Sequence, residues 1–99
     1  MMHYELRYRI MQKLEKGAFF ADEINSNVSN IHICVRKMKL KEGIRLRYIS
    51  HKGNNPYLII FKDNQKAWGI LIKRFPNLKK KEKDGILRLI LNNQNGGYK

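Results

Sequence analysis

The chain has 99 residues, 42% of them hydrophobic, and its 21 lysines and arginines outnumber eight acids to give a net charge of +13. This length suits one compact domain, and the apolar content supports a modest core and excludes a disordered tail. So large a charge imbalance costs self-repulsion, which a polyanionic partner would offset. We therefore expect a nucleic acid as partner, ahead of an anionic membrane or a merely soluble basic surface.

The chain has a single cysteine, Cys34, so no intrachain disulfide can form and a reducing, cytoplasmic compartment is expected. Its apolar neighbours Ile31, Val35 and Met38 predict a small buried thiol rather than a nucleophile. No stretch approaches about 18 uninterrupted apolar residues, and the start MMHYELRYRI lacks the apolar run of a signal peptide. We therefore expect no membrane span.

Residues 4–16 are predicted to form a helix, because their apolar positions recur at helical spacing. One stripe consists of Leu6, Ile10 and Leu14. A second, nearly opposite stripe consists of Tyr4, Tyr8 and Met11. Gly17 fits a C-terminal cap. Two stripes suggest that this helix is covered on both sides.

A short helix is expected next, because Phe19, Phe20 and Ile24 follow a helical period. The segment NSN at positions 25–27 is typical of a turn, since its side chains hydrogen-bond to the local backbone. A third helix then covers residues 28–41.

After Gly43 the hydrophobic period changes from helical to alternating. The stretch IRLRYIS alternates apolar and basic residues, which predicts a half-buried strand. HKGNNP is a turn cluster, and YLIIFK is a second run with high strand propensity. Together they predict an antiparallel hairpin over residues 44–62.

The last third of the chain, residues 63–92, is predicted to form a helical extension, although WGILIKRF is also compatible with a strand. Its apolar residues exceed what a small three-helix core needs and include Trp68, Leu71, Ile72, Phe75, Ile86, Leu89 and Ile90. They would either cover the Tyr4, Tyr8 and Met11 stripe or form a two-fold homodimer interface, and we favour the homodimer. No linker marks a boundary, so residues 1–99 form one domain.

The order of helix, short helix, Asn/Ser turn, helix and β-hairpin over residues 4–62 resembles the winged helix-turn-helix superfamily. The resemblance rests on element order and spacing. It implies an α+β fold of three helices and a β-hairpin wing, here with additional C-terminal helical segments. It also implies that the third helix, which Asn27 or Ser29 would cap, enters the major groove of DNA.

The face of this helix opposite its apolar stripe has chemistry suited to reading bases. Arg36 would make a bidentate contact with guanine, Asn30 would pair with adenine, and Ile33 would contact a thymine methyl group. The alternative is an ordinary solvated face. The predicted recognition residues are Ser29, Asn30, His32, Ile33, Arg36 and Lys37.

The hairpin would act as the wing, because Arg45 and Arg47 project from one strand face and basic side chains favour the minor groove. Most of its contacts would go to phosphates, which position the protein without specifying a sequence. The alternative for the two arginines is a solvated strand face. The predicted phosphate and wing residues are Lys39, Lys41, Arg45, Arg47, Lys52, Asn54 and Asn55.

Catalytic chemistry has little support in the sequence. His3, His32 and His51 are not at metal-ligand spacing with each other or with Cys34, and no phosphate-binding glycine loop is present. We therefore expect no enzyme, no metal and no cofactor.

These patterns predict a sequence-specific double-stranded DNA-binding protein, a small transcription regulator of the phage, plasmid or mobile-element type. One alternative is an RNA-binding or ribosome-associated protein, in which Tyr48 and Tyr57 of the hairpin would stack on bases. The other is an adaptor of the transcription machinery that binds an acidic partner such as a polymerase subunit.

Overall fold

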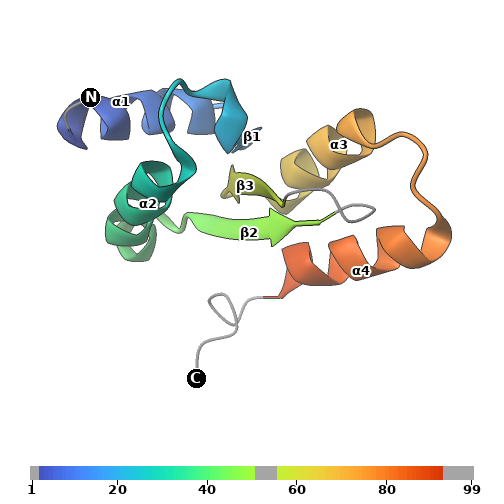
Figure 1. The fold of residues 1–99 in the computed structure, drawn as a ribbon. Coiled ribbons are helices and arrows are strands. Elements are labelled where there is room, and N and C mark those ends of the chain that lie inside the picture. The colour runs from blue at the N-terminus through green and yellow to red at the C-terminus, as the bar shows by residue number, and fades with distance from the viewer. Residues whose placement is uncertain (1–2, 51–55, 93–99) are drawn as a thin grey trace.

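The computed structural model describes residues 3–50 and 56–92, which form four helices and a three-stranded antiparallel sheet (Figure 1). The chain is thus an α+β fold, as the sequence predicts. In chain order the elements are α1 (His3–Leu14), β1 (Ala18–Phe20), the 3-10 helix η1 (Ala21–Glu23), α2 (Val28–Glu42), β2 (Arg45–Ile49), β3 (Tyr57–Phe61), α3 (Asn64–Arg74) and α4 (Lys80–Leu91). Within these ranges no helix combines the length and apolarity needed to cross a membrane.

The sheet has the strand order β1-β3-β2, so β3 is central and pairs with both neighbours in antiparallel register. Successive side chains of a strand point to opposite faces. Accordingly Leu58 and Ile60 contribute to one hydrophobic cluster, while Ile59 and Phe61 contribute to another. The α1–α2 pair covers one face of the sheet and the α3–α4 pair covers the other (Figure 1).

The first cluster confirms the two main helical stripes of the sequence. It includes the buried side chains of Leu6, Ile10, Leu14, Ile31, Val35 and Met38. Burial of side chains of this size contributes about 1.5–3 kcal/mol each, which makes the contact between α1, α2 and the sheet a main source of stability. This contact fixes which side of α2 remains at the surface.

The second cluster corrects the role expected for the C-terminal segments. Leu71, Phe75, Ile86 and Ile90 are buried on the opposite face of the sheet, so they neither cover the tyrosine stripe of α1 nor stay available for a homodimer interface. Tyr4 and Tyr8 are 71% and 63% exposed, and only Met11 of that stripe packs against the first core. Within the residues that the structure describes, α1 is therefore covered on one side and not on both as expected, and a homodimer remains a prediction.

The short helix expected around Phe19 and Phe20 is also wrong, because this segment is strand β1 followed by η1. In the strand the two rings point in opposite directions, Phe19 into the first cluster and Phe20 into the second. Filling two cores at once requires alternation, and pairing with β3 satisfies the backbone. A helix would place the rings about 100° apart and leave one core unfilled.

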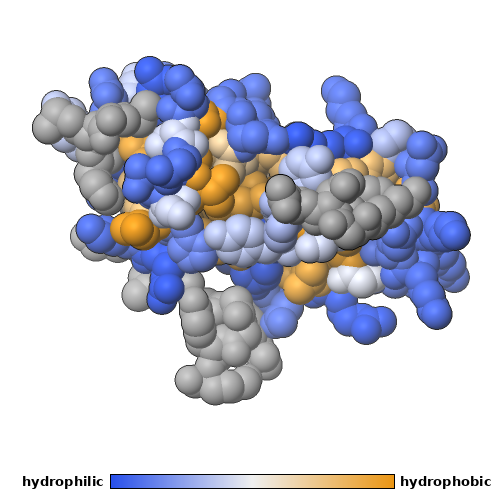
Figure 2. All heavy atoms as spheres, in the orientation of Figure 1, coloured by the Kyte–Doolittle hydropathy of each residue, from blue (hydrophilic) through white to orange (hydrophobic). Residues whose placement is uncertain are grey.

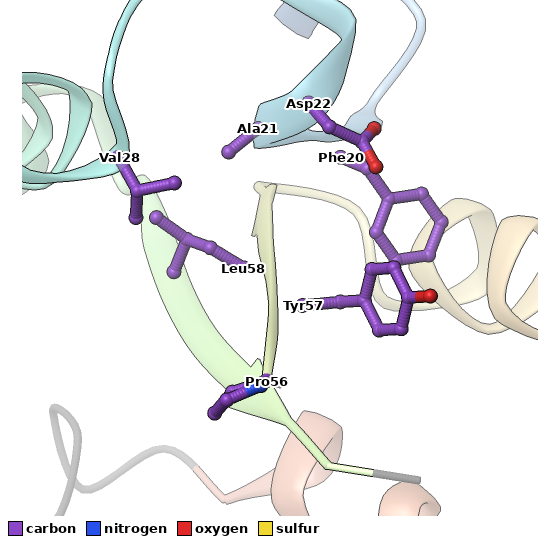
Figure 3. Close-up of a pocket in the computed structure, with 7 residues that line it drawn as sticks. All are labelled: Phe20, Ala21, Asp22, Val28, Pro56, Tyr57 and Leu58. Atoms are coloured by element: carbon purple, nitrogen blue, oxygen red, sulfur yellow. The ribbon is translucent and has the colours of Figure 1, made fainter. Parts of the chain in front are cut away.

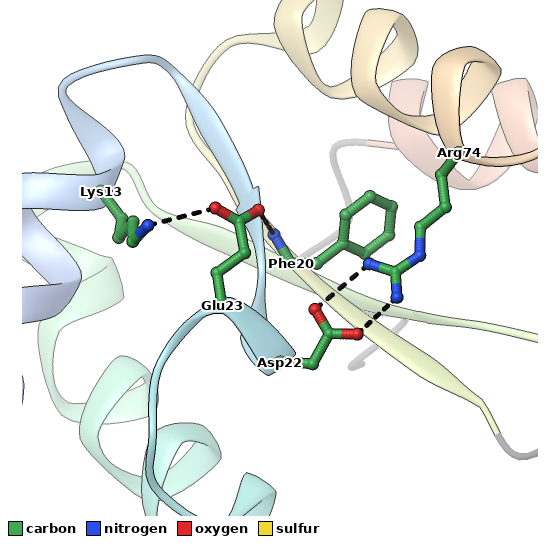
Figure 4. Close-up of polar contacts among 5 residues, drawn as sticks. All are labelled: Lys13, Phe20, Asp22, Glu23 and Arg74. Carbon is green, nitrogen blue, oxygen red and sulfur yellow. Dashed lines mark hydrogen bonds and ion pairs between the residues drawn. The ribbon is translucent and has the colours of Figure 1, made fainter.

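Polar contacts hold η1 in place between the two helix pairs (Figure 4). Glu23 accepts a hydrogen bond from the Phe20 amide at 3.0 Å and forms an ion pair with Lys13 of α1 at 3.3 Å. Asp22 accepts a bidentate pair of hydrogen bonds from Arg74 of α3. The acids of this segment therefore connect α1 and α3 to the turn that precedes α2.

Candidate nucleic-acid interface

The outer face of α2 is exposed where the sequence predicts recognition residues. Ser29, Asn30, Ile33, Arg36 and Lys37 are all exposed. The opposite side of the helix is formed by the buried residues Ile31, Cys34, Val35 and Met38. Ile33 is 48% exposed, which is an unusual position for an aliphatic side chain on a basic face. The structure thus brings five of the six predicted recognition residues together on one surface.

The start of α2 is defined by Asn27, whose Oδ1 accepts a hydrogen bond from the Asn30 amide at 2.8 Å. Of the two caps that the sequence allows, the structure selects Asn27. A capped first turn holds the side chains of Ser29 and Asn30 in a defined direction. These are the helix positions from which base edges are contacted when a helix enters the major groove by its N-terminal end.

His32, the sixth predicted residue, lies at the border of this face and joins α2 to the hairpin. Its Nδ1 is 2.8 Å from the Tyr48 hydroxyl, and the two rings stack with centroids 5.7 Å apart. His32 therefore positions Tyr48 of β2 beside α2, in addition to any contact with a ligand. Sequence reasoning missed this pair, because the register of β2 against α2 is set by the tertiary fold.

The wing arginines differ from what the sequence predicts. Arg47 is only 8% exposed, and its guanidinium donates to the carbonyl oxygens of Leu89 at 3.1 Å and Asn92 at 2.7 Å. The expected exposed position of Arg47, from which it would reach phosphate, is wrong, because its donors serve the C-terminal end of α4. Burial, with a smaller effect of Arg45, lowers the pKa of Arg47, yet a guanidinium stays charged at neutral pH.

Arg45 occupies an intermediate position. Its guanidinium carbon lies 4.7 Å from the centre of the Phe61 ring, and the side chain is half-buried. Burial lowers the pKa of Arg45 as well. The cation–π contact with Phe61 holds the Arg45 guanidinium in place. Arg45 therefore contributes positive charge at a defined position on the hairpin.

The remaining predicted contacts cannot be placed on this surface. The side chains of Lys39 and Lys41, and the whole of Lys52, Asn54 and Asn55, lie outside the residues that the structure describes. Their assignment as phosphate contacts remains a prediction.

Tyr48 and Tyr57 do not form one stacking platform. Tyr48 is paired with Leu58 in the β2–β3 register, whereas Tyr57 is paired with Ile49, so the two rings lie on opposite faces of the sheet. Tyr57 instead packs edge-on against Phe75, with ring centroids 5.3 Å apart, in the second core. One stacking platform that spans both tyrosines is therefore excluded, and RNA binding remains an alternative prediction.

A groove between α1 and α2 adjoins the exposed face of α2. It has a volume of about 310 Å³ and is lined by Tyr4, Arg7, Cys34, Lys37 and Met38. Burial raises the pKa of the Cys34 thiol, and the charges of Arg7 and Lys37 partly oppose this rise. The positive charges of Arg7 and Lys37 therefore reach the Cys34 thiol at the floor of this groove. Sequence reasoning missed Arg7, since only helix packing brings it beside α2.

A second pocket, of about 510 Å³, lies between η1, the first residue of α2 and the start of β3, where Val28 and Leu58 point toward each other and the rings of Phe20 and Tyr57 lie side by side (Figure 3). Its one carboxylate, Asp22, is engaged by Arg74, whose guanidinium carbon also lies 4.5 Å from the centre of the Phe20 ring. The hydrogen bonds with Asp22 raise the pKa of Arg74. The Arg74 guanidinium also lies 4.6 Å from the centre of the Tyr57 ring, so the positive charge beside this pocket is already engaged by Asp22 and two aromatic rings.

In the part of the chain that the structure describes, no cluster of three histidine, cysteine or acidic side chains is placed to hold a metal ion. Hydrophilic side chains cover most of the outer surface of the helices in the view of Figure 2, while apolar side chains appear between the α1–α2 pair and the sheet and again in the region of α4. Comparison of the chain with protein-family models, with curated proteins and with solved structures gives no match. Functional conclusions therefore rest on the geometry and charge of this surface.

Proposed function

We propose that this protein binds double-stranded DNA in a sequence-specific manner and acts as a small transcription regulator. The observation that carries the proposal is the outer face of α2, where cations, an amide and a hydroxyl share one exposed surface. Positions 28–41 contain no acid, so nothing on this stretch repels a phosphate backbone. The net charge of +13 acts in the same direction.

We infer a winged-helix arrangement for the complex, in which α2 enters the major groove and the β2–β3 hairpin follows the backbone as a wing. The strand order β1-β3-β2 and the position of α2 directly before the hairpin support this arrangement. In it, η1 and the capped turn at Asn27 take the place of the first helix of a helix-turn-helix motif. The α3–α4 pair lies on the far side of the sheet, away from the DNA.

The contacts follow from the side-chain chemistry of the exposed face. Arg36 donates a bidentate pair of hydrogen bonds to guanine, and Asn30 pairs with adenine. Ile33, which is 48% exposed, finds an apolar partner in a thymine methyl group. Lys37 contacts a phosphate, which adds affinity without specificity.

Replacement of Arg36 tests the proposal. Arg36→Ala is expected to weaken binding to a selected DNA site by about 1–3 kcal/mol and to relax the preference at one base position. The site is obtained by selecting bound fragments from genomic DNA, and affinity is measured by fluorescence anisotropy at fixed salt. Arg9→Ala is the matched control, because Arg9 is an exposed arginine of α1 outside the proposed face.

Two results would contradict the proposal in different ways. Unchanged specificity in Arg36→Ala would mean that α2 is not the recognition helix. Failure of the wild-type protein to retard any duplex at low salt would exclude DNA binding and favour the adaptor alternative.

A further inference from the structure

The groove between α1 and α2 combines a flat aromatic wall, an apolar floor and positive charge at its rim. Tyr4 is 71% exposed and forms the wall, while Cys34 and Met38 are buried beneath it. Arg7 comes from α1 and Lys37 from α2, so the two helices place their cations on the same groove. The sulfur atoms of Cys34 and Met38, 3.9 Å apart, give the floor a soft and polarisable character.

This combination matches one nucleotide. An aromatic side chain stacks on the face of any base, and cations at a rim hold the phosphate that accompanies it. The volume of about 310 Å³ lies at the lower end of the range for ligand pockets, which suits a single base. Glu5 is the one acid among residues 3–14, and it projects about 100° away from Tyr4 around α1.

The groove also continues the proposed DNA-binding face, because Lys37 belongs to both surfaces. A base within an intact duplex is stacked and paired, so it cannot present its face to a pocket. An unpaired nucleotide at the end of a duplex, or one extruded from it, has both faces available.

We propose that the α1–α2 groove binds an unpaired nucleotide next to the duplex, with its base stacked on Tyr4 and its phosphate held by Arg7 and Lys37. This inference rests on the proposed DNA-binding role of α2, and it implies that a duplex with a single-stranded extension is a better ligand than a blunt one. Tyr8 follows Tyr4 by one helical turn and is 63% exposed, so it offers a surface for the next base. The Tyr8 hydroxyl accepts a hydrogen bond from Gln12 at 3.2 Å, which steadies the ring.

The test compares three fluorescently labelled probes: a blunt duplex, the same duplex with a short single-stranded extension, and the extension strand alone. Wild-type protein is expected to bind the extended duplex at least about fivefold more tightly than the blunt duplex, which is the lower limit for stacking one base. Tyr4→Ala should abolish this gain and leave binding to the blunt duplex unchanged. Because Tyr4 lies at the surface, the variant should remain folded, which circular dichroism checks.

Two further variants separate stacking from other contacts. Tyr4→Phe keeps the ring and should retain the gain, since stacking does not need the hydroxyl. Arg7→Gln should reduce the gain and its salt dependence, whereas Arg9→Gln removes the same charge outside the groove and should not.

The inference is overturned if wild-type protein binds the blunt and extended duplexes equally, or if the gain persists in Tyr4→Ala. A gain lost in both Tyr4→Phe and Tyr4→Ala would also overturn it, because a hydroxyl–phosphate contact would then explain the data. If no blunt duplex binds at all, the proposed function of α2 fails separately. In that case weaker binding of the lone strand by Tyr4→Ala supports the groove, and unchanged binding overturns it.

Discussion

Arg47 stabilises the fold through backbone carbonyls that lie far from it in the chain. It donates to its own neighbour Leu46 at 2.8 Å, and to Leu89 and Asn92 near the end of α4. The last carbonyl groups of a helix lack partners within it, and a cation there also interacts favourably with the helix dipole. Arg47 therefore attaches α4 to β2 and closes the second core at that end.

Replacement of Arg47 by methionine, Arg47→Met, is expected to lower the free energy of unfolding by about 2–3 kcal/mol. The methionine keeps the apolar stem but leaves the carbonyls of Leu89 and Asn92 without their donor. Urea unfolding followed by circular dichroism measures the change. Arg9→Met, at an exposed position, should change stability by less than about 0.5 kcal/mol, and an equal loss in both variants would refute the role of Arg47.

At the scale of elements, the junction between α1 and β1 depends on Gly17. Its φ of +96° lies in the left-handed region, and its carbonyl accepts hydrogen bonds from the amides of Lys62 and Asp63. A Cβ atom at this position would lie 2.7 Å from the Lys66 Cγ atom. Gly17 therefore lets α1 end beside the start of α3, which brings the N-terminal helix and the C-terminal helix pair onto one sheet.

Three glycine replacements test the role of Gly17, and the expected change in stability differs in sign among them. Gly17→Ala should destabilise the protein by about 1–2 kcal/mol, because of its backbone conformation and the clash with Lys66. Gly69→Ala in α3 and Gly85→Ala in α4 should each stabilise it by about 0.5–1 kcal/mol, since nothing lies within 4 Å of the added atom. Melting temperatures of the three variants decide, and stabilisation by Gly17→Ala would contradict the strained junction.

Strand β1, which the sequence periodicity predicts as a helix, shows where local patterns are insufficient to assign secondary structure. The segment AFFADE is too short for a helical hydrophobic period to be distinguished from the alternating period of a strand. The choice depends on whether Phe19 and Phe20 meet one core or two, and the second core is built by residues 64–91, far along the chain. By contrast, the stripes of α1 and α2 extend over several turns and predict these helices correctly.

For the whole molecule, the net charge of +13 should make stability and DNA binding respond to salt in opposite directions. The ion pairs Lys13–Glu23 and Arg74–Asp22 connect elements around η1, but eight acids cannot neutralise 21 basic side chains. The folded state therefore carries repulsion that the more expanded unfolded chain relieves.

Raising sodium chloride from about 0.02 M to about 0.5 M shortens the Debye length to a few ångströms, so it should increase the free energy of unfolding measured in urea. The same change should weaken DNA binding steeply, because bound counterions are no longer released with the same gain in free energy. A fall in stability with salt would show instead that local ion pairs outweigh the net repulsion. Potassium chloride should reproduce both trends.

The sequence by itself determined the α+β class, the apolar stripes of α1 and α2, the hairpin and the exposed basic face of α2, because each depends on periodicity or charge within one segment. The tertiary structure alone decided that α3 and α4 cover the second face of the sheet, that β1 is a strand, and that Arg47 serves α4 rather than solvent. It also brought Arg7 beside Lys37. These features join residues distant in the chain, and their free energy depends on partners that no local pattern specifies.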